Sequence, residues 1–210
     1  MHHYITPKRA TAAKQVYNSG SSTAFVRVDV VEVDAKGKPL STAPAGGILR
    51  NGLLASPSRL IIPAGGSQSV RMIAMGDRSH ERYFRVRFVP VAPVREHGFA
   101  VTAAEEEAFK AEATTAINIL VGYGVRVVSA PANARFDTRI DEAAGTVTNA
   151  GDSMIFLRDH YACSRPKQCG SPTNDRIAPG ASLHLAGEGL THRFVLQEGD
   201  EERPIVLSNK

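Results

Sequence analysis

Tryptophan is absent from this sequence of 210 residues, cysteine occurs only twice, and aromatic residues make up only 6% of the chain. No stretch is long and apolar enough to cross a membrane. The start, MHHYITPKRA, lacks the apolar core of a signal peptide. The chain is therefore expected to be either cytosolic or the remainder of a protein from which a signal has been removed.

Charge of one sign is not concentrated in the sequence. The net charge is +4, but Arg85 and Arg87 alternate with Phe84, Val86 and Phe88, as on the solvated face of a sheet. Nucleic-acid binding usually needs a denser basic patch. The sequence therefore predicts no nucleic-acid partner.

Local signatures of catalysis are missing as well. There is no G-x-x-x-x-G-K-S/T phosphate loop, no G-x-S-x-G and no H-E-x-x-H. His160, His184 and His192 can converge as metal ligands, but histidines on β-sheet surfaces are usually only solvated. The motifs favour a binding protein over an enzyme and predict neither a cofactor nor a metal.

The two cysteines, Cys163 and Cys169, lie six residues apart in YACSRPKQCG and can close a tight loop by a disulfide. A zinc site is the alternative, but it needs four ligands, and only His160 lies close by in the sequence. The disulfide is favoured, and with it an oxidising compartment.

Short runs rich in valine and isoleucine, separated by turns, predict an all-β chain. TAFVRVDVVEVD alternates, with Val26, Val28 and Val30 on one face, and RYFRVRFVPVAP alternates until its prolines. LLASPSRLIIPAGGSQSVRMIAM is expected to form two strands joined by a turn at PAGG. Residues 94–115 are expected to form a mobile loop with a helical turn.

After SAPANA, which looks like a linker, short strands restart about ten residues apart, as in a β-sandwich. They are expected in ARFDTRI, GTVTNAG, SMIFLRDHYAC, DRIAPGASLHL, THRFVLQ and RPIVLS. The sequence therefore predicts two all-β domains, residues 1–130 and the smaller residues 131–210.

One predicted strand, INILVGYGVRVV at residues 117–128, has a continuous apolar face at its odd-numbered positions. An ordinary strand of this length would turn that face towards its own core. What this face binds is the question that the sequence raises.

Several segments together resemble the periplasmic pilus chaperones of the chaperone–usher pathway. The similar segments are LLASPSRLIIPAGGSQSVRM, ERYFRVRFVPVAP, INILVGYGVRVVSAP and GTVTNAGDSMIFL. The pair in HYACSRPKQCG followed by IAPGAS is closest to the alternate branch, which assembles coli-surface-antigen-type and common pili. The resemblance covers nearly the whole chain. It implies two immunoglobulin-like β-sandwich domains set at an angle, a periplasmic location and no catalysis.

The resemblance also implies what the apolar face binds. A pilus subunit is an immunoglobulin-like fold that lacks its last strand, and the chaperone supplies that strand by strand addition. The implied donor residues are Ile117, Ile119 and Val121, with Ala113 or Thr115 further out, while Tyr123, Val125 and Val127 belong to the chaperone's own core. The implied partners are pilus subunits, including the major pilin and the tip adhesin, and an outer-membrane usher.

Charged residues carry two further implications of the resemblance. Arg71 and Glu81 match a buried ion pair near the cleft, joined by Glu198 or Asp200 from the second domain; a plain surface pair is the alternative.

The second implication is an anchor for the subunit's terminal carboxylate. Arg126 matches the last-strand cation of this anchor, and arginine can bind a carboxylate through two hydrogen bonds. The first-strand arginine of the family falls near His3, so the second cation is assigned to Lys8 or Arg9.

Two other functions stay open. A structural immunoglobulin-like pilus or adhesin protein would usually carry an alternating donor extension, which MHHYITPKRATAAKQV does not show. A metal-dependent periplasmic enzyme would contain a bound metal. The sequence names neither the pilus nor its subunits, and it leaves open whether the free protein self-associates.

Overall fold

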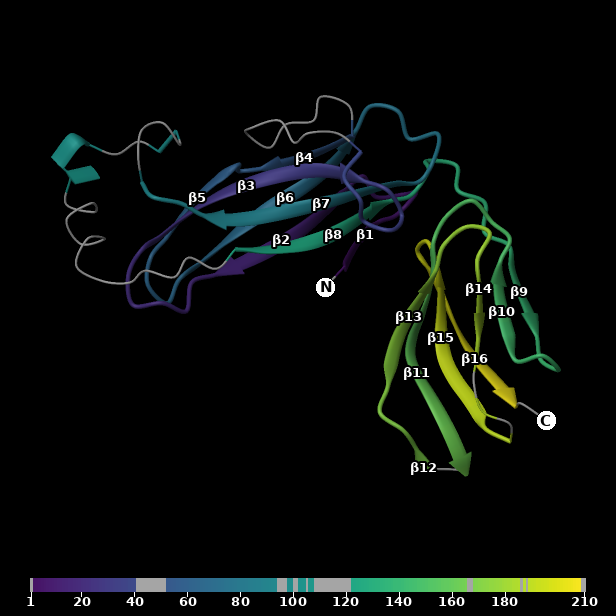
Figure 1. Cartoon of the computed structure of the whole chain (residues 1–210). Coiled ribbons are helices and arrows are strands. Elements are labelled where there is room, and N and C mark those ends of the chain that lie inside the picture. Colours follow the sequence, from purple (N-terminus) through teal and green to yellow (C-terminus); the bar gives the residue numbers. More distant parts are fainter. Residues whose placement is uncertain are drawn as a thin grey trace. The chain divides into compact units, whose positions relative to one another are not determined.

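The structure is a computed structural model, and it describes residues 2–40, 52–93, 98–99, 102–104, 106–107, 122–165, 168–185, 187 and 189–208. These residues form an all-β chain divided into two compact units (Figure 1). The first unit holds Met1–Ile5, Ala10–Asp77 and Arg82–Val128, and the second holds Thr6–Arg9, Arg78–Glu81 and Ser129–Lys210. Two short segments from the first half of the chain thus belong to the second unit.

Two sheets make up the first unit. Among the described residues one sheet has five strands in the order β1-β8-β7-β3-β5, and the other has three in the order β2-β6-β4. The strands are β1 (His2–Ile5), β2 (Thr11–Tyr17), β3 (Ala24–Val33), β4 (Gly52–Ser56), β5 (Arg59–Ile62), β6 (Ser67–Met75), β7 (Arg82–Pro90) and β8 (Tyr123–Ser129).

The alternating sequences of β3 and β7 explain the core of this unit. The two strands pair antiparallel, with Val28 opposite Phe88 and Val30 opposite Val86. All four side chains are buried in one apolar cluster with residues from the other sheet. Burying each contributes about 1.5–3 kcal/mol. The alternation expected in both strands is confirmed.

The segment LLASPSRLIIPAGGSQSVRMIAM forms three strands, so the expectation of two was wrong. β4 pairs with β6, whereas β5 pairs with β3 in the other sheet. Pro57, which has no N–H to donate to a strand ladder, separates β4 from β5. The chain changes sheets at this proline.

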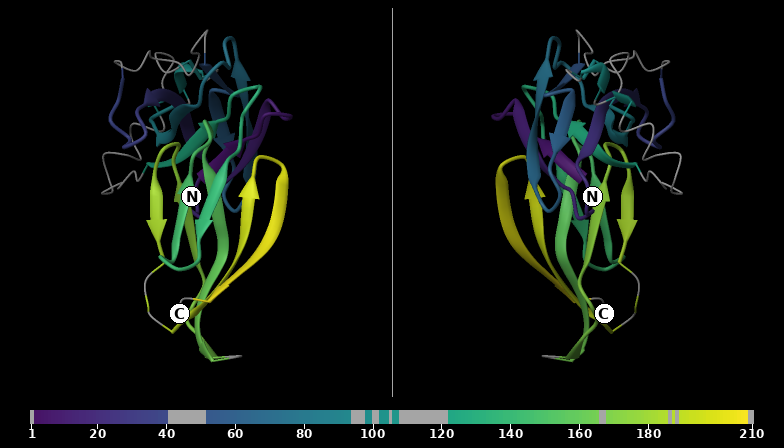
Figure 2. Two further views of the ribbon diagram at one scale, coloured as in Figure 1. Left: turned by 90° about the vertical axis from the view of Figure 1, so that its right-hand side faces the viewer. Right: turned by 90° about the vertical axis from the view of Figure 1, so that its left-hand side faces the viewer.

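The second unit is also a β-sandwich (Figure 2). One sheet has the order β14-β10-β9 and the other β12-β11-β15-β16, with β13 also paired to β11. The strands are β9 (Thr138–Asp141), β10 (Thr146–Asn149), β11 (Ile155–Arg165), β12 (Gln168–Cys169), β13 (Thr173–Ile177), β14 (Ser182–His184), β15 (Thr191–Glu198) and β16 (Glu201–Ser208). DRIAPGASLHL therefore contributes two strands in different sheets, and β12 was not expected.

The predicted all-β architecture of two sandwiches is confirmed. The continuous part of the second unit begins at Ser129, close to the predicted boundary after residue 130. In the long connection, the N–H of Glu106 donates to the carbonyl of Thr102 at 3.0 Å, as in a helical turn. In the parts of the chain that are described, no helix has the length and apolar character needed to span a bilayer.

Candidate functional site

Strand β8 continues the stretch that was predicted to bind a pilus protein. It lies between β1 and β7. Val125 and Val127 point into the core of the first unit, as expected. Tyr123, at the start of the strand, is 43% exposed and stacks on Phe88 with ring centroids 4.9 Å apart. It therefore lies at the margin of the core and not inside it.

Two glycines bring the start of β8 close to β7. A Cβ atom at Gly122 would lie 3.1 Å from the carbonyl oxygen of Phe88, and one at Gly124 would lie 3.4 Å from that of Val86. The missing side chains thus allow the close approach of the two backbones. The predicted donor residues Ile117, Ile119 and Val121, and the outer candidates Ala113 and Thr115, lie outside the described residues.

Arg126 reaches the turn that follows β3. Its Nη1 donates to the carbonyl of Ala35 at 3.5 Å, and Nη2 of Arg85 donates to the carbonyl of Gly37 at 3.1 Å. Gly37 has φ +92°, and a Cβ there would come 2.5 Å from Nη2 of Arg126. Glycine makes this turn possible beneath the guanidinium. Among the described residues, Arg85 and Arg126 have no carboxylate partner.

The other two predicted anchor cations, Lys8 and Arg9, belong to the second unit. Nη2 of Arg9 donates to Oδ1 of Asp200 at 2.8 Å, and its Nε donates to the same oxygen at 3.2 Å. Burial would raise the pKa of the Asp200 carboxyl. Hydrogen bonds from Arg9 and Thr6, with the charges of Arg9 and Lys8, outweigh burial and lower that pKa. Arg9 is therefore engaged with Asp200.

Glu81 is held within the second unit. Its Oε2 accepts hydrogen bonds from the Ser153 hydroxyl at 2.9 Å and from the N–H of Met154 at 2.5 Å. Arg71 lies on β6 of the first unit, where its side chain is exposed. The ion pair between Arg71 and Glu81, with Asp200 as third member, stays a prediction.

The sequence reasoning missed Arg78, which joins three passages of the chain within the second unit. Its Nη2 donates to the carbonyl of Thr6 at 2.8 Å and to that of Ala130 at 3.0 Å. The N–H of Ala132 donates to the carbonyl of Arg78 at 2.8 Å. Nothing in the stretch GDRSHER distinguishes this arginine from a solvated one.

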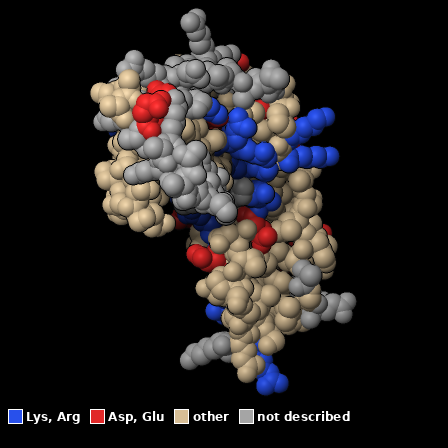
Figure 3. Space-filling view, turned by 60° about the vertical axis from the view of Figure 1, so that its left-hand side comes forward, with Lys and Arg blue, Asp and Glu red and all other residues tan. Residues whose placement is uncertain are grey.

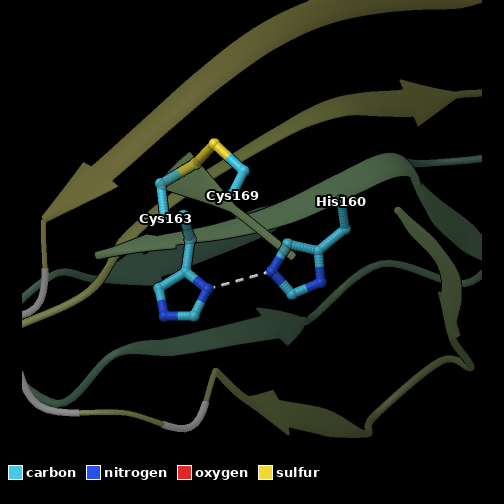
Figure 4. Close-up of a disulfide and its surroundings, with 4 residues drawn as sticks. His160, Cys163 and Cys169 are labelled. Atoms are coloured by element: carbon cyan, nitrogen blue, oxygen red, sulfur yellow. Dashed lines mark hydrogen bonds between the residues drawn. A yellow bond between two sulfur atoms is a disulfide. The ribbon is translucent and has the colours of Figure 1, made fainter. Parts of the chain in front are cut away.

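Cys163 and Cys169 form the predicted disulfide, which joins β11 to β12 (Figure 4). Beside it, Nε2 of His160 and Nδ1 of His192 are hydrogen bonded at 3.0 Å, and Nδ1 of His160 lies 3.2 Å from Oδ2 of Asp175. Over the described ranges, no three or more histidine, cysteine or acidic side chains are grouped so that they could hold a metal ion.

Comparison with known proteins gives relatives over most of the chain. No family model matches. The chain is 25% identical over 191 residues to a protein of the CS1 fimbriae of Escherichia coli, covering 86% of this chain and 77% of that protein. It is 27% identical over 174 residues to the probable fimbrial chaperone EcpE of Escherichia coli strain K12, covering 82% and 67%.

Solved structures show the same fold. The class 5 fimbriae chaperone CfaA matches 100% of this chain and 95% of its own, with a TM-score of 0.55 and 18% identity. The Salmonella enterica SafA pilin–SafB chaperone complex gives a match over 99% and 91%, with a TM-score of 0.53 and 16% identity. The resemblance to pilus chaperones with two immunoglobulin-like domains is confirmed.

Proposed function

We propose, from the premise that this chain belongs to the pilus chaperones of the chaperone–usher pathway, that it folds and caps pilus subunits by donating a β-strand. The donated strand is the stretch before β8, with Ile117, Ile119 and Val121 as its anchors. The subunits, which include a major pilin and a tip adhesin, are then delivered to an outer-membrane usher. The disulfide supports an oxidising compartment, and we place the protein in the periplasm.

One observation carries the proposal. The apolar alternation of residues 117–127 is longer than the part that the core of the first unit uses, because the core takes Val125 and Val127 while Tyr123 is already 43% exposed. Three apolar anchors in the groove of a pilus subunit would contribute about 5–9 kcal/mol at 1.5–3 kcal/mol each. The cost of association offsets much of this gain, and backbone hydrogen bonds along the strand add to it.

Charged residues complete the proposal. Arg126 holds the terminal carboxylate of the bound pilus subunit, with Lys8 or Arg9 as the second cation. Fixing the chain end fixes the register of the donated strand, and a slip of one residue would turn every anchor away from its pocket. Arg71, Glu81 and Asp200 form ion pairs between the domains.

Replacing Ile119 by Asp tests strand donation. A charge cannot enter an apolar pocket without a partner. Ile119→Asp should therefore abolish co-purification with a pilus subunit expressed in the same periplasm, while the melting temperature of the free protein stays within a few degrees. Asn118→Asp places the same charge on the opposite face and should co-purify normally.

Val127→Asp provides the contrasting control, because Val127 is fully buried and the variant should unfold. If Ile119→Asp unfolds the free protein as Val127→Asp does, Ile119 belongs to the protein's own core and the proposed register is wrong. Normal co-purification of pilus subunits with a folded Ile119→Asp variant would reject strand donation through this residue.

A further inference from the structure

The outer face of the five-stranded sheet in the first unit is rich in arginine. Because side chains alternate between the faces of a strand, the residues between the buried ones of β3, β5, β7 and β8 point outward. The charged residues among them are Arg27, Asp29, Arg59, Arg85, Arg87 and Arg126. Lysine and arginine side chains gather in a band on the face of the molecule that Figure 3 displays.

Asp29 organises the centre of this face. It lies opposite Arg87 in the register of β3 and β7, and it is only 3% exposed. Nε of Arg27 lies 3.1 Å from Oδ1 of Asp29, and Nη2 of Arg87 lies 3.5 Å from its Oδ2. One buried carboxylate thus positions two guanidinium groups and neutralises only one of their charges.

Arg85 adds an uncompensated charge next to this group. It lies opposite Val31, one alternation along β7 from Arg87. Its described hydrogen bond goes to a backbone carbonyl, that of Gly37. The face therefore keeps a positive excess over β3 and β7, with donors already held in place by Asp29 and by the turn at Gly37.

We infer that the outer face of β3 and β7 binds an acidic, extended polypeptide segment in which carboxylates alternate with neutral residues. Arg85 and Arg87 repeat at two residues along one strand, which is about 6.8 Å. Acids at alternate positions of an extended segment repeat at the same spacing on one of its faces. The planar guanidinium group matches a carboxylate through two parallel hydrogen bonds.

The strand register favours a polypeptide over an anionic lipid surface. Lipid headgroups have no fixed repeat along one direction, whereas an extended chain has the repeat of the arginines. The inference goes beyond the proposed function and does not depend on it, because the face lies on β3 and β7 and includes none of the donor residues.

Binding of two peptides of the same composition tests the inference. The probe is Thr-Glu-Thr-Glu-Thr-Glu-Thr, and the comparison is Thr-Thr-Glu-Glu-Glu-Thr-Thr, titrated into the full-length protein at low salt. The alternating peptide should bind about tenfold more tightly, and its affinity should fall steeply with added salt. Equal binding of both peptides would overturn the inference.

Variants place the binding on this face. Arg85→Ala with Arg87→Ala should weaken the alternating peptide at least tenfold, while Asp29 keeps Arg27 as its partner. The matched control is Arg193→Ala, an exposed arginine on β15 of the second unit. An equal loss in both variants would mean that only net charge matters and would overturn the inference.

Charge-preserving variants cover the case in which the alanine pair does not fold. Arg85→Lys with Arg87→Lys keeps the charge but loses the paired hydrogen bonds, and it should weaken the alternating peptide several-fold. Unchanged affinity of a folded lysine pair would overturn the inference. Tighter binding of the unmodified protein to anionic phospholipid vesicles than to the peptide, lost in the same variants, would assign the face to a membrane instead.

Discussion

At Asn149, one side chain satisfies three backbone groups inside the second unit. Its Nδ2 donates to the carbonyls of Ser153 and Ile177, both at 2.9 Å, and its Oδ1 accepts from the N–H of Gly151 at 3.0 Å. The residue is fully buried. These contacts give a structural reason for the asparagine in GTVTNAG, a segment that the sequence alone marks only as a motif.

Asn149→Ala should lower the free energy of unfolding of the second unit by about 2–4 kcal/mol, because buried backbone groups lose their partners. Urea unfolding of the full-length protein measures the effect. Thr148→Val, one position earlier, removes only an exposed contact to the Ser182 hydroxyl at 2.8 Å and should cost less than about 1 kcal/mol. Equal effects of the two changes would contradict the role of Asn149.

His192 makes the stability of the second unit depend on pH. It is 1% exposed, and burial is the main cause that lowers its pKa below 6.5; the charges of His160 and His184 lower it further. Below about pH 6.5 the unfolded chain therefore binds more protons at this residue than the folded protein does. The free energy of unfolding should fall as pH drops from 6.5 towards the folded-state pKa, by at most about 1.4 kcal/mol per pH unit from this group.

Urea unfolding at pH 7.5, 6.5 and 5.5 checks this dependence. His192→Leu should flatten the loss of stability between pH 6.5 and 5.5, because the group that titrates is gone. His80→Gln is the control, since His80 is exposed. An unchanged slope in His192→Leu would assign the pH dependence to other groups.

Among the elements, the hairpin of β11 and β12 depends on its disulfide. Cys163 lies directly opposite Cys169 in the pairing, and the Cα atoms are 3.9 Å apart. β12 spans only two residues and has few other contacts to stabilise its pairing. Cys163→Ser with Cys169→Ser should therefore lower the free energy of unfolding by about 2–3 kcal/mol, as expected for closing so short a loop.

Thiol titration of protein unfolded without reductant should find no free thiol before this replacement. The backbone hydrogen bond from Gly170 to Ala162, at 3.0 Å, should then exchange its amide faster in the serine variant than in the unmodified protein. Two free thiols in protein made in the periplasm would contradict the pairing.

Elements with strong alternation could be predicted from the sequence, and the others could not. β3 and β7 were expected because their apolar residues alternate over a full strand. β2 shows no apolar alternation, since only Val16 is buried in it, and its pairing with β6 fixes it as a strand. The burial of Asp29 beneath Arg27 and Arg87 depends on a register between residues about sixty positions apart, which local patterns do not contain.

At the scale of the whole molecule, the second unit is built from three stretches of the chain. Thr6–Arg9 and Arg78–Glu81 come from the first half and carry Arg9, Arg78 and Glu81 into it. The sequence suggested a single boundary near residue 130, because a linker such as SAPANA is visible as composition. A segment of four residues that joins a distant unit through backbone carbonyls leaves no such signal.

The stability of the second unit should therefore depend on a residue more than fifty positions before Ser129, where its continuous part begins. Arg78→Ala removes the donors to the carbonyls of Thr6 and Ala130, and Ala130 is fully buried. A buried carbonyl without a partner costs about 1–3 kcal/mol. Hydrogen exchange of the full-length protein should show reduced protection in β11 and β15, while β3 and β7 keep theirs.

Arg139→Ala is the matched control, because Arg139 lies in the second unit and its ion pair with Asp137, at 3.0 Å, is on the surface. Exposed ion pairs contribute less than about 1 kcal/mol, so exchange in β11 and β15 should change little. If Arg78→Ala instead reduces protection in β3 and β7, the segment Arg78–Glu81 supports the first unit. If it changes neither unit, the carbonyls of Thr6 and Ala130 are satisfied by water, and the three stretches are held together by the apolar core of the second unit alone.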